Sequence, residues 1–255
     1  LNIGNVPIND IQVKNKDVLI ATQGRAIWIL DNVSALHQIT SEMTVAESHL
    51  FAPKDGYRTS TAAHLLGPNI DYYLPTPASG TVTLDILDQA GVIVNSYNSA
   101  QPPRGGRGGG GFGRRGGGLP APSVTTSAGF NRVVWNVRDT EGLPVPPGQY
   151  QVRMGIGGES QTQRFNVLID PRVEAGGVTV ADLREQYEHN KRMNAMVAEV
   201  DALIERVRAA QDSDDNNLQR RIAPIAEKLI TAPIRYSSPG LRDHITYLQG
   251  MTARV

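Results

Sequence analysis

The amino-acid sequence predicts a mainly β chain with an α-helical tail. Two patterns support this prediction. Up to Ile169, apolar residues alternate with polar ones in short runs, which is typical of half-buried β-strands. After Asp170 they recur at steps of mostly three and four, which is the period of an amphipathic helix. The chain therefore divides into a β-rich part and a helical part.

The composition limits the class of protein. At 255 residues the chain is long enough for about two domains. Lys plus Arg and Asp plus Glu number 25 each, so no overall electrostatic field attracts nucleic acid or an anionic membrane. The absence of cysteine excludes disulfides, thiolate nucleophiles and cysteine-ligated zinc.

The chain contains no apolar run close to the roughly 18–20 residues of a membrane-spanning helix. No signal peptide is recognisable within it. Its first residue is Leu1 rather than Met, so we expect a piece of a longer protein, with any signal peptide upstream.

Residues 10–31 are predicted to form three short strands joined by tight polar turns, as in an antiparallel meander. Asn15-Lys16 supplies the first turn. Three strands cannot bury both faces of their own sheet, so we expect packing partners outside this chain. The strands are expected at residues 11–13, 18–20 and 26–30.

A connector and a β-sandwich are expected to follow. Residues 35–68 contain scattered apolar residues and two prolines, which predicts an irregular connector over the surface of its neighbours. Residues 69–173 hold period-2 strands with turn signals every 10 to 15 residues, which is typical of a small sandwich. Residues 102–123 interrupt this unit with a Gly/Arg tract, predicted to be a disordered loop because ordered glycine loses much backbone entropy.

Residues 174–255 are predicted to form a helical hairpin or a three-helix bundle. Thr179 and Asp182 have the spacing of a capping box at the start of a helix of about 30 residues. A second helix is expected to kink or restart at Pro224, and a third to open at Pro239.

The stretch DVLIATQGRAIWILDN, residues 17–32, resembles the last-blade signature of bacterial sortilin-type β-propeller proteins, which also carry neuraminidase-like (BNR) repeats. In that family a strand ending in Ala-Thr, a Gly-Arg turn and an aromatic-rich strand ending in Leu-Asp close the propeller. Gln23 stands at a turn position that is often His, and the Asp-box of the repeats is absent from this chain. The resemblance implies that residues 1–34 are the end of a propeller. The matching positions are Ala21, Thr22, Gly24, Arg25, Trp28, Leu30 and Asp31.

The downstream motifs follow the order of the same family's tail. The middle of the series is similar to the small Ig-like domain of flagellar hook-capping proteins, which implies an Ig-like sandwich with Trp135, Gly148 and Tyr150 as structural residues. Such proteins are commonly labelled glycosyl hydrolases, and the resemblance implies an exported protein, periplasmic, outer-membrane-associated or extracellular. The motifs are IDYYL (70–74), VTLDILDQAG (82–91), GFNRVVWNVRD (129–139), PPGQY (146–150) and VLIDPRV (167–173).

No nucleophile, base and oxyanion site assemble from the sequence, so we expect no catalytic, cofactor or metal residues in this chain. The histidines are dispersed, without a His-Glu-x-x-His spacing. Strand-end and turn roles explain the carboxylates that a glycosidase could use. The residues considered are His37, His49, His64, His189 and His244, and Asp71, Asp85, Asp88 and Asp139.

The segment after the long helix mimics the start of a calcium loop through Asp212, Asp214 and Asn216. Asn217 stands where the loop needs Gly and Ala223 where it needs Glu, so a helix–helix linker is the better interpretation.

The Gly/Arg tract offers an alternative function, because it resembles an RGG box that binds RNA through phosphate contacts and base stacking. Four charges and one aromatic ring give a modest attraction, and a position between two strands favours an expanded loop. The residues are Arg104, Arg107, Phe112, Arg114 and Arg115.

Together these features predict a non-catalytic C-terminal accessory region of a secreted sortilin-like propeller protein. It would brace the propeller or mediate interaction with a protein or glycan, with the upstream propeller as its first partner and a peptide or glycan as a candidate ligand. Nucleic acid is not the expected partner, and no membrane span is expected. The alternative is that the chain belongs to a glycosidase-like exported enzyme whose active site lies upstream.

Overall fold

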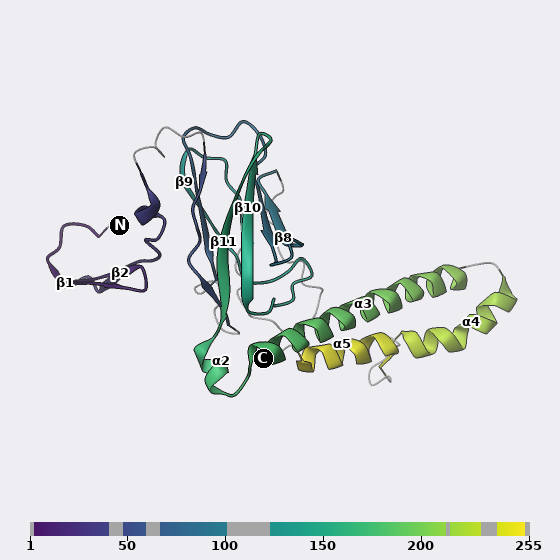
Figure 1. The fold of residues 1–255 in the computed structure, drawn as a ribbon. Helices are drawn as coiled ribbons and strands as arrows, with labels where there is room; N and C mark the ends of the chain where they lie inside the picture. The colour runs from purple at the N-terminus through teal and green to yellow at the C-terminus, as the bar shows by residue number, and fades with distance from the viewer. Residues whose placement is uncertain are drawn as a thin grey trace. The chain divides into compact units, whose positions relative to one another are not determined.

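The computed structural model describes residues 3–40, 48–59, 67–100, 123–212, 215–230 and 239–252. The chain divides into two compact units, Leu1–Asp170 and Pro171–Val255. Three β-sheets lie in the first unit and four α-helices in the second, within the described residues (Figure 1). The structure thus combines several β-sheets with a helical region at the C-terminal end.

The first sheet is antiparallel and contains β1 (Ile8–Lys14), β2 (Asp17–Thr22) and β3 (Ile27–Leu30), in that order. Asn15 and Lys16 join β1 to β2 with positive φ angles of 52° and 64°. Positive φ at both central residues is the signature of a type I′ turn, whose twist matches that of a hairpin. The predicted turn residues therefore fix the register of this sheet.

Two further sheets make up the rest of the first unit. One is antiparallel, in the order β4 (His49–Leu50), β6 (Asn69–Leu74) and β9 (Gly129–Val134). The other has the order β5 (Gly56–Arg58), β11 (Glu159–Ile169), β10 (Gly148–Ile156), β7 (Thr83–Leu87) and β8 (Ile93–Asn98). In the second of these sheets, β5 pairs parallel to β11 and the other pairs are antiparallel.

Both sheets bury apolar side chains, as the sandwich prediction requires. Ile70 and Tyr72 of β6 are fully buried, as are Leu84 of β7 and Val152 of β10. Trp135, directly after β9, places its ring 5.4 Å from the Tyr150 ring of β10, centroid to centroid. Side chains from the two sheets therefore share one core, an arrangement consistent with a β-sandwich.

The segment expected to be an irregular connector contributes to both of these sheets. Within residues 35–68, β4 adds a two-residue strand and β5 a three-residue strand, and Leu50 and Phe51 are buried. Strands this short carry no periodic signal, so the sequence pattern did not reveal them.

One predicted strand ends earlier than expected. Trp135 and Val137 lie beyond β9 instead of sharing its face with Val133, and Val137 has a φ of +58°. The Gly/Arg tract lies outside the described residues, so its expected disorder stays a prediction.

The second unit contains α2 (Pro171–Ala175), α3 (Val180–Gln211), α4 (Asn216–Leu229) and α5 (Leu241–Thr252). The capping box is present: the Thr179 side chain accepts from the Asp182 backbone, and Asp182 accepts from the Thr179 backbone. Pro224 lies inside α4 rather than restarting it. None of the helices in the described residues combines the length and apolar character needed to cross a membrane.

The partners of α3 differ between its two halves. Its C-terminal half packs against α4 in a cluster of Ile204, Val207, Ala226 and Leu229. Its N-terminal half packs against α5, where Thr252 donates a 2.8 Å hydrogen bond to Asn190. α4 and α5 thus lie one after the other along α3 (Figure 1).

Replacing Thr179 with alanine is expected to destabilise the helical unit by about 1 kcal/mol, because the Asp182 backbone N–H loses its side-chain acceptor. Thr179→Ser keeps a hydroxyl and is the matched control, expected to cost a few tenths of a kcal/mol at most. Thermal unfolding followed by the helical circular dichroism signal measures both. Equal losses in the two variants would contradict a capping role.

Candidate functional site

The residues of the propeller-like signature have local structural contacts. Gly24 adopts a φ of +80° in the turn between β2 and β3. The Trp28 indole N–H donates to the Arg25 carbonyl oxygen at 2.9 Å, which closes this turn. Asp31 accepts a 3.4 Å hydrogen bond from Asn69 at the start of β6. These residues shape the sheet and connect it to the sandwich, and they bring no nucleophile and base together.

The first sheet exposes large apolar side chains on both faces. The register places Ile11 opposite Ile20 on one face and Leu19 opposite Ile29 on the other. Ile11 is 56% exposed and Val13 is 68% exposed on the first face. Ile27 and Ile29 are 67% and 60% exposed on the second. An unpaired apolar area on two opposite faces is unusual for a sheet whose packing is complete.

A polar cluster holds the chain after β3 against the sandwich. Arg132 of β9 forms a bidentate ion pair with Asp71 of β6, with distances of 2.6 Å from Nε and 3.0 Å from Nη2. The Asp71 side chain is 3% exposed, whereas that of Arg132 is 37% exposed. The hydrogen bond that Arg132 donates to Asp71 raises the pKa of Arg132, although burial opposes this shift.

Asn32 completes this cluster from the other side. Its side-chain amide donates to Asp71 at 3.5 Å, and its backbone carbonyl oxygen accepts from Arg132 at 3.4 Å. Asn32 has a φ of +53°, a conformation that Asn tolerates better than most residues. We call Asn32, Asp71 and Arg132 the polar joint.

Apolar and amide contacts extend the joint along the next residues. Ala35 packs with Phe51 and Tyr73, and the Phe51 ring stacks on Phe130 at 4.9 Å. Gln38 donates to the Ala52 carbonyl at 3.1 Å and accepts from its N–H at 2.9 Å. The ion pair between Lys54 and Asp17 at 3.2 Å adds a direct link to β2. The chain from residue 32 to residue 38 is therefore docked at several points.

Sequence reasoning did not identify the joint as a site, although Asp71 and Arg132 lie within two of the motifs that it used. The available signal was a single charged residue within each strand, between Ile70 and Tyr72 in IDYYL and before Val133 in FNRVV. A charge in such a strand needs a partner.

His49 of β4 is expected to make stability depend on pH. Its ring meets Phe51 edge-on at 4.9 Å, and burial lowers its pKa below 6.5. Because the unfolded chain then binds the proton more readily, stability is expected to fall as the pH drops through about 6.5, and to level off below the folded-state pKa.

The urea midpoint measured between pH 7.5 and 5.5 tests this dependence. His49→Gln should reduce the loss of midpoint relative to the unsubstituted protein, because it removes the titrating group. An identical loss in both proteins would assign the dependence to other groups.

The three sandwich residues singled out from the sequence have core and strand-end positions. Trp135 is fully buried and donates from its indole N–H to the Arg138 carbonyl at 2.9 Å. Tyr150 is buried and its hydroxyl donates to the Pro146 carbonyl at 2.8 Å. Gly148 opens β10, opposite Val167.

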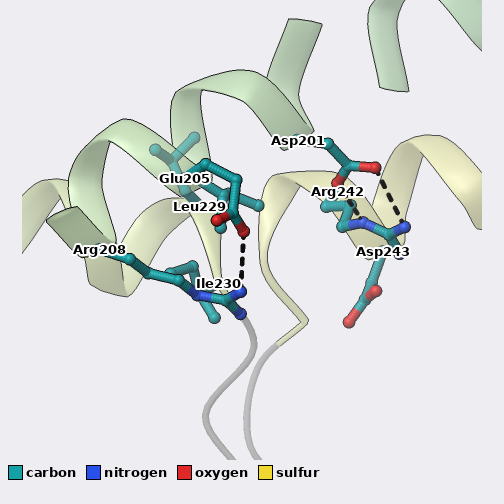
Figure 2. Close-up of a pocket in the computed structure, with 8 residues that line it drawn as sticks. Asp201, Glu205, Arg208, Leu229, Ile230, Arg242 and Asp243 are labelled. Carbon is teal, nitrogen blue, oxygen red and sulfur yellow. Dashed lines mark hydrogen bonds and ion pairs between the residues drawn. The ribbon is translucent and has the colours of Figure 1, made fainter. Parts of the chain in front are cut away.

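The helical unit contains a groove of about 510 Å³ between α3, the end of α4 and the start of α5 (Figure 2). Arg242 is paired with Asp201 at 2.5 Å, and Arg208 with Glu205 at 3.1 Å. Asp201 raises the pKa of Arg242 through this hydrogen bond. Since both arginines are engaged by carboxylates, the groove offers no ready site for an anion. Its remaining lining residues are Ile204, Leu229, Ile230 and Asp243.

The carboxylates considered as glycosidase candidates are used in structural contacts. Asp71 pairs with Arg132 and Asp85 with Arg153, while Asp88 and Asp139 accept from turn backbone groups. Within the described residues, no three His, Cys, Asp or Glu side chains gather as metal ligands would.

Other candidates lie wholly or partly outside the described residues. Asp212 is the C-cap of α3, but residues 213 and 214 of the calcium-like segment are not described. His64 and the RNA-binding candidates are also outside. The latter are Arg104, Arg107, Phe112, Arg114 and Arg115.

No protein-family model matches this chain, and no curated protein matches it. Several solved structures show weak similarity, and three of them are given below. The BSP domain of a biofilm-associated protein aligns with a TM-score of 0.26 and 13% identity, covering 47% of this chain and 15% of that one.

The second is PorZ, a bacterial surface component of the type-IX secretion system of Porphyromonas gingivalis. It aligns with a TM-score of 0.23 and 18% identity over 64% of this chain and 23% of its own. The third, FLGD from P. aeruginosa, has a TM-score of 0.23 and 22% identity over 38% of this chain and 56% of its own. The chain thus spans less than two thirds of each of these proteins, and TM-scores this low do not establish a shared fold.

Proposed function

We propose that this chain is the non-catalytic C-terminal accessory region of a secreted sortilin-like β-propeller protein. In this proposal residues 1–34 are the last blade, residues 69–173 are an Ig-like sandwich, and residues 174–255 form a helical hairpin or three-helix bundle. The region braces the propeller or presents it to a protein or glycan partner. The protein is exported to the periplasm, the outer membrane or the cell exterior.

The exposed apolar side chains on both faces of the β1–β2–β3 sheet support this proposal most directly. The blades of a propeller are arranged radially around a centre, so a blade has a neighbour on each face. Burying the exposed area of Ile11, Val13, Ile27 and Ile29, each 56–68% exposed, would contribute roughly 1–2 kcal/mol for each side chain. A three-stranded sheet with such side chains on its two faces suits a position between two other sheets.

The polar joint supports a bracing role. Asn32 lies two residues after the last strand of the proposed blade and contacts Asp71 and Arg132 of the sandwich. Buried charges and amides require specific partners, so they favour one orientation over others. The joint would hold the sandwich in a fixed orientation at the end of the propeller.

Two features of the sandwich favour an Ig-like identity. The hydroxyl of Tyr150 donates to a backbone carbonyl four residues upstream, as in the tyrosine corner of such domains. Trp135 fills the core between the sheets, packing on Phe165 at 5.9 Å as well as on Tyr150. The alternative is that the chain belongs to a glycosidase-like enzyme with an upstream active site. It expects the same domains in this chain, so the features of the sandwich do not distinguish the two versions.

Glycan and peptide arrays distinguish the versions of this proposal. We expect the protein purified from its natural source to bind a ligand that the 255-residue chain does not bind. Binding by the 255-residue chain alone would overturn the upstream location of the site. Turnover of a bound glycan by the natural protein would favour the glycosidase alternative over a binding role.

A further inference from the structure

The five-stranded sheet of the sandwich ends in an edge strand, β8, within the described part of the chain. An edge strand presents free backbone N–H and C=O groups that can pair with a strand of another molecule. Residues 138–143, which we call the guard segment, lie against this edge. The guard segment follows β9 of the other sheet, so the two sheets meet at this point.

Backbone and side-chain hydrogen bonds join the guard segment to β8. The Thr140 N–H donates to the Val94 carbonyl at 3.1 Å. The Asn95 side-chain amide donates to the Arg138 carbonyl at 2.8 Å. The Val94 carbonyl, which a new strand would use, is therefore already engaged, and the Asn95 side chain ties the guard segment to β8 beside it.

A bulge adds a second obstacle at the same position. Ile86 of β7 faces Asn95 and Leu87 faces Ile93, so Val94 is an extra residue in β8. A bulge twists an edge strand and interrupts its regular ladder, which discourages pairing with another strand. The guard segment binds β8 at this bulge.

The local backbone departs from favourable conformations where the chain turns toward β8. Val137 is a β-branched residue with a φ of +58°, a conformation that such residues rarely adopt. Among the described residues, no hydrogen-bond partner meets the buried Oδ1 atom of the neighbouring Asn136. Unfavourable geometry that persists in a fold points to a role for the segment that it positions.

From these contacts we infer that the guard segment prevents β8 from pairing with β8 of a second copy of this chain. Its release would free the backbone edge of β8 for antiparallel strand addition. This inference is independent of the proposed function, since it concerns the sandwich alone.

The turn inside the guard segment allows a precise substitution. The Gly142 N–H donates to the Asp139 carbonyl at 3.1 Å, and Gly142 has a φ of +84°. Neither Thr140 nor Glu141 has a positive φ, which fits a type I turn with Thr140 at its second position. Proline is favoured there, so Thr140→Pro removes the N–H donor to Val94 without opposing the turn. Thr140→Ala keeps this N–H and is the matched control.

The experiment introduces Ser96→Cys as a probe on β8, because the chain has no other cysteine and Ser96 is exposed. A short bis-maleimide then cross-links two chains only when their β8 strands lie close together. We expect the cross-linked dimer to increase several-fold in Thr140→Pro relative to Thr140→Ala, and further when Asn95→Ala is added.

Equal cross-linking in the Thr140→Pro and Thr140→Ala proteins, with unchanged far-ultraviolet circular dichroism, would overturn the inference. If Thr140→Pro does not fold, the test compares cross-linking of the Asn95→Ala variant with that of the protein that keeps Asn95. Asn95→Ala removes the hydrogen bond to the Arg138 carbonyl and leaves the turn intact. No increase in that variant would equally overturn it.

Discussion

Replacing Trp135 with alanine is expected to lower the free energy of unfolding of the sandwich by about 3–5 kcal/mol. Trp135 is fully buried, its ring packs on Tyr150 and Phe165, and its N–H is bound to the Arg138 carbonyl. The substitution leaves a cavity between the two sheets and removes one of the two side-chain hydrogen bonds that the Arg138 carbonyl accepts. Urea unfolding followed by far-ultraviolet circular dichroism measures the loss.

Trp28 provides the matched control, because it is the other tryptophan of the chain and is only half-buried. Trp28→Ala removes a local bond to Arg25 and is expected to cost about 1 kcal/mol in the 255-residue chain. Similar costs at the two positions would contradict the assignment of Trp135 to the shared core of the sheets.

Removing the positive charge of the polar joint is expected to lower the free energy of unfolding more than removing its negative charge. Arg132→Met leaves the Asp71 carboxylate, with 3% exposure, without its ion pair. We expect a cost of about 2–4 kcal/mol, toward the low end for buried pairs because Arg132 itself is 37% exposed. Asp71→Asn leaves a half-exposed guanidinium that water can solvate, and is expected to cost about 1–2 kcal/mol.

Urea unfolding of the two single variants and of the double variant measures this asymmetry. The double variant should cost less than the sum of the single ones, since each removes the same interaction. An Asp71→Asn cost equal to or greater than that of Arg132→Met would contradict the burial that the structure gives to this pair.

Local signals in the sequence predicted the local features of the fold. The capping box at Thr179 and Asp182 involves residues three positions apart, and the Asn15-Lys16 turn needs nothing beyond two residues. Period-2 alternation likewise located β7, β10 and β11, because each strand buries one face. Such features depend on neighbours along the chain.

Features formed by distant residues could not be predicted in the same way. β5 is three residues long and pairs with β11 of the sandwich, far along the chain. Its Gly56 lies against Pro68, where an added Cβ would come within 2.5 Å of the proline ring. In the polar joint, Asp71 contacts Asn32 and Arg132, which are 39 and 61 positions away in the sequence, so no local pattern predicts these contacts.

The position of the first sheet within a larger protein stays a prediction that the exposed faces motivate. Its strands, the Gly24 turn and the Trp28 bond to Arg25 agree with a compact hairpin unit. The family resemblance implies a propeller, and neighbouring blades on the two faces of the sheet would explain its exposed isoleucines. The weakly similar solved structures add nothing further to this assignment.

Hydrogen exchange of the β1–β2–β3 sheet tests the central claim most directly. In the protein purified from its natural source, amides of β1 and β3 should exchange more than about tenfold more slowly than in the 255-residue chain, because neighbouring blades cover the sheet. Amides of β10 serve as the internal reference and should exchange equally in both. Equal exchange of β1 and β3 in the two proteins would show that nothing covers the sheet, and would contradict its assignment as the last blade of a propeller.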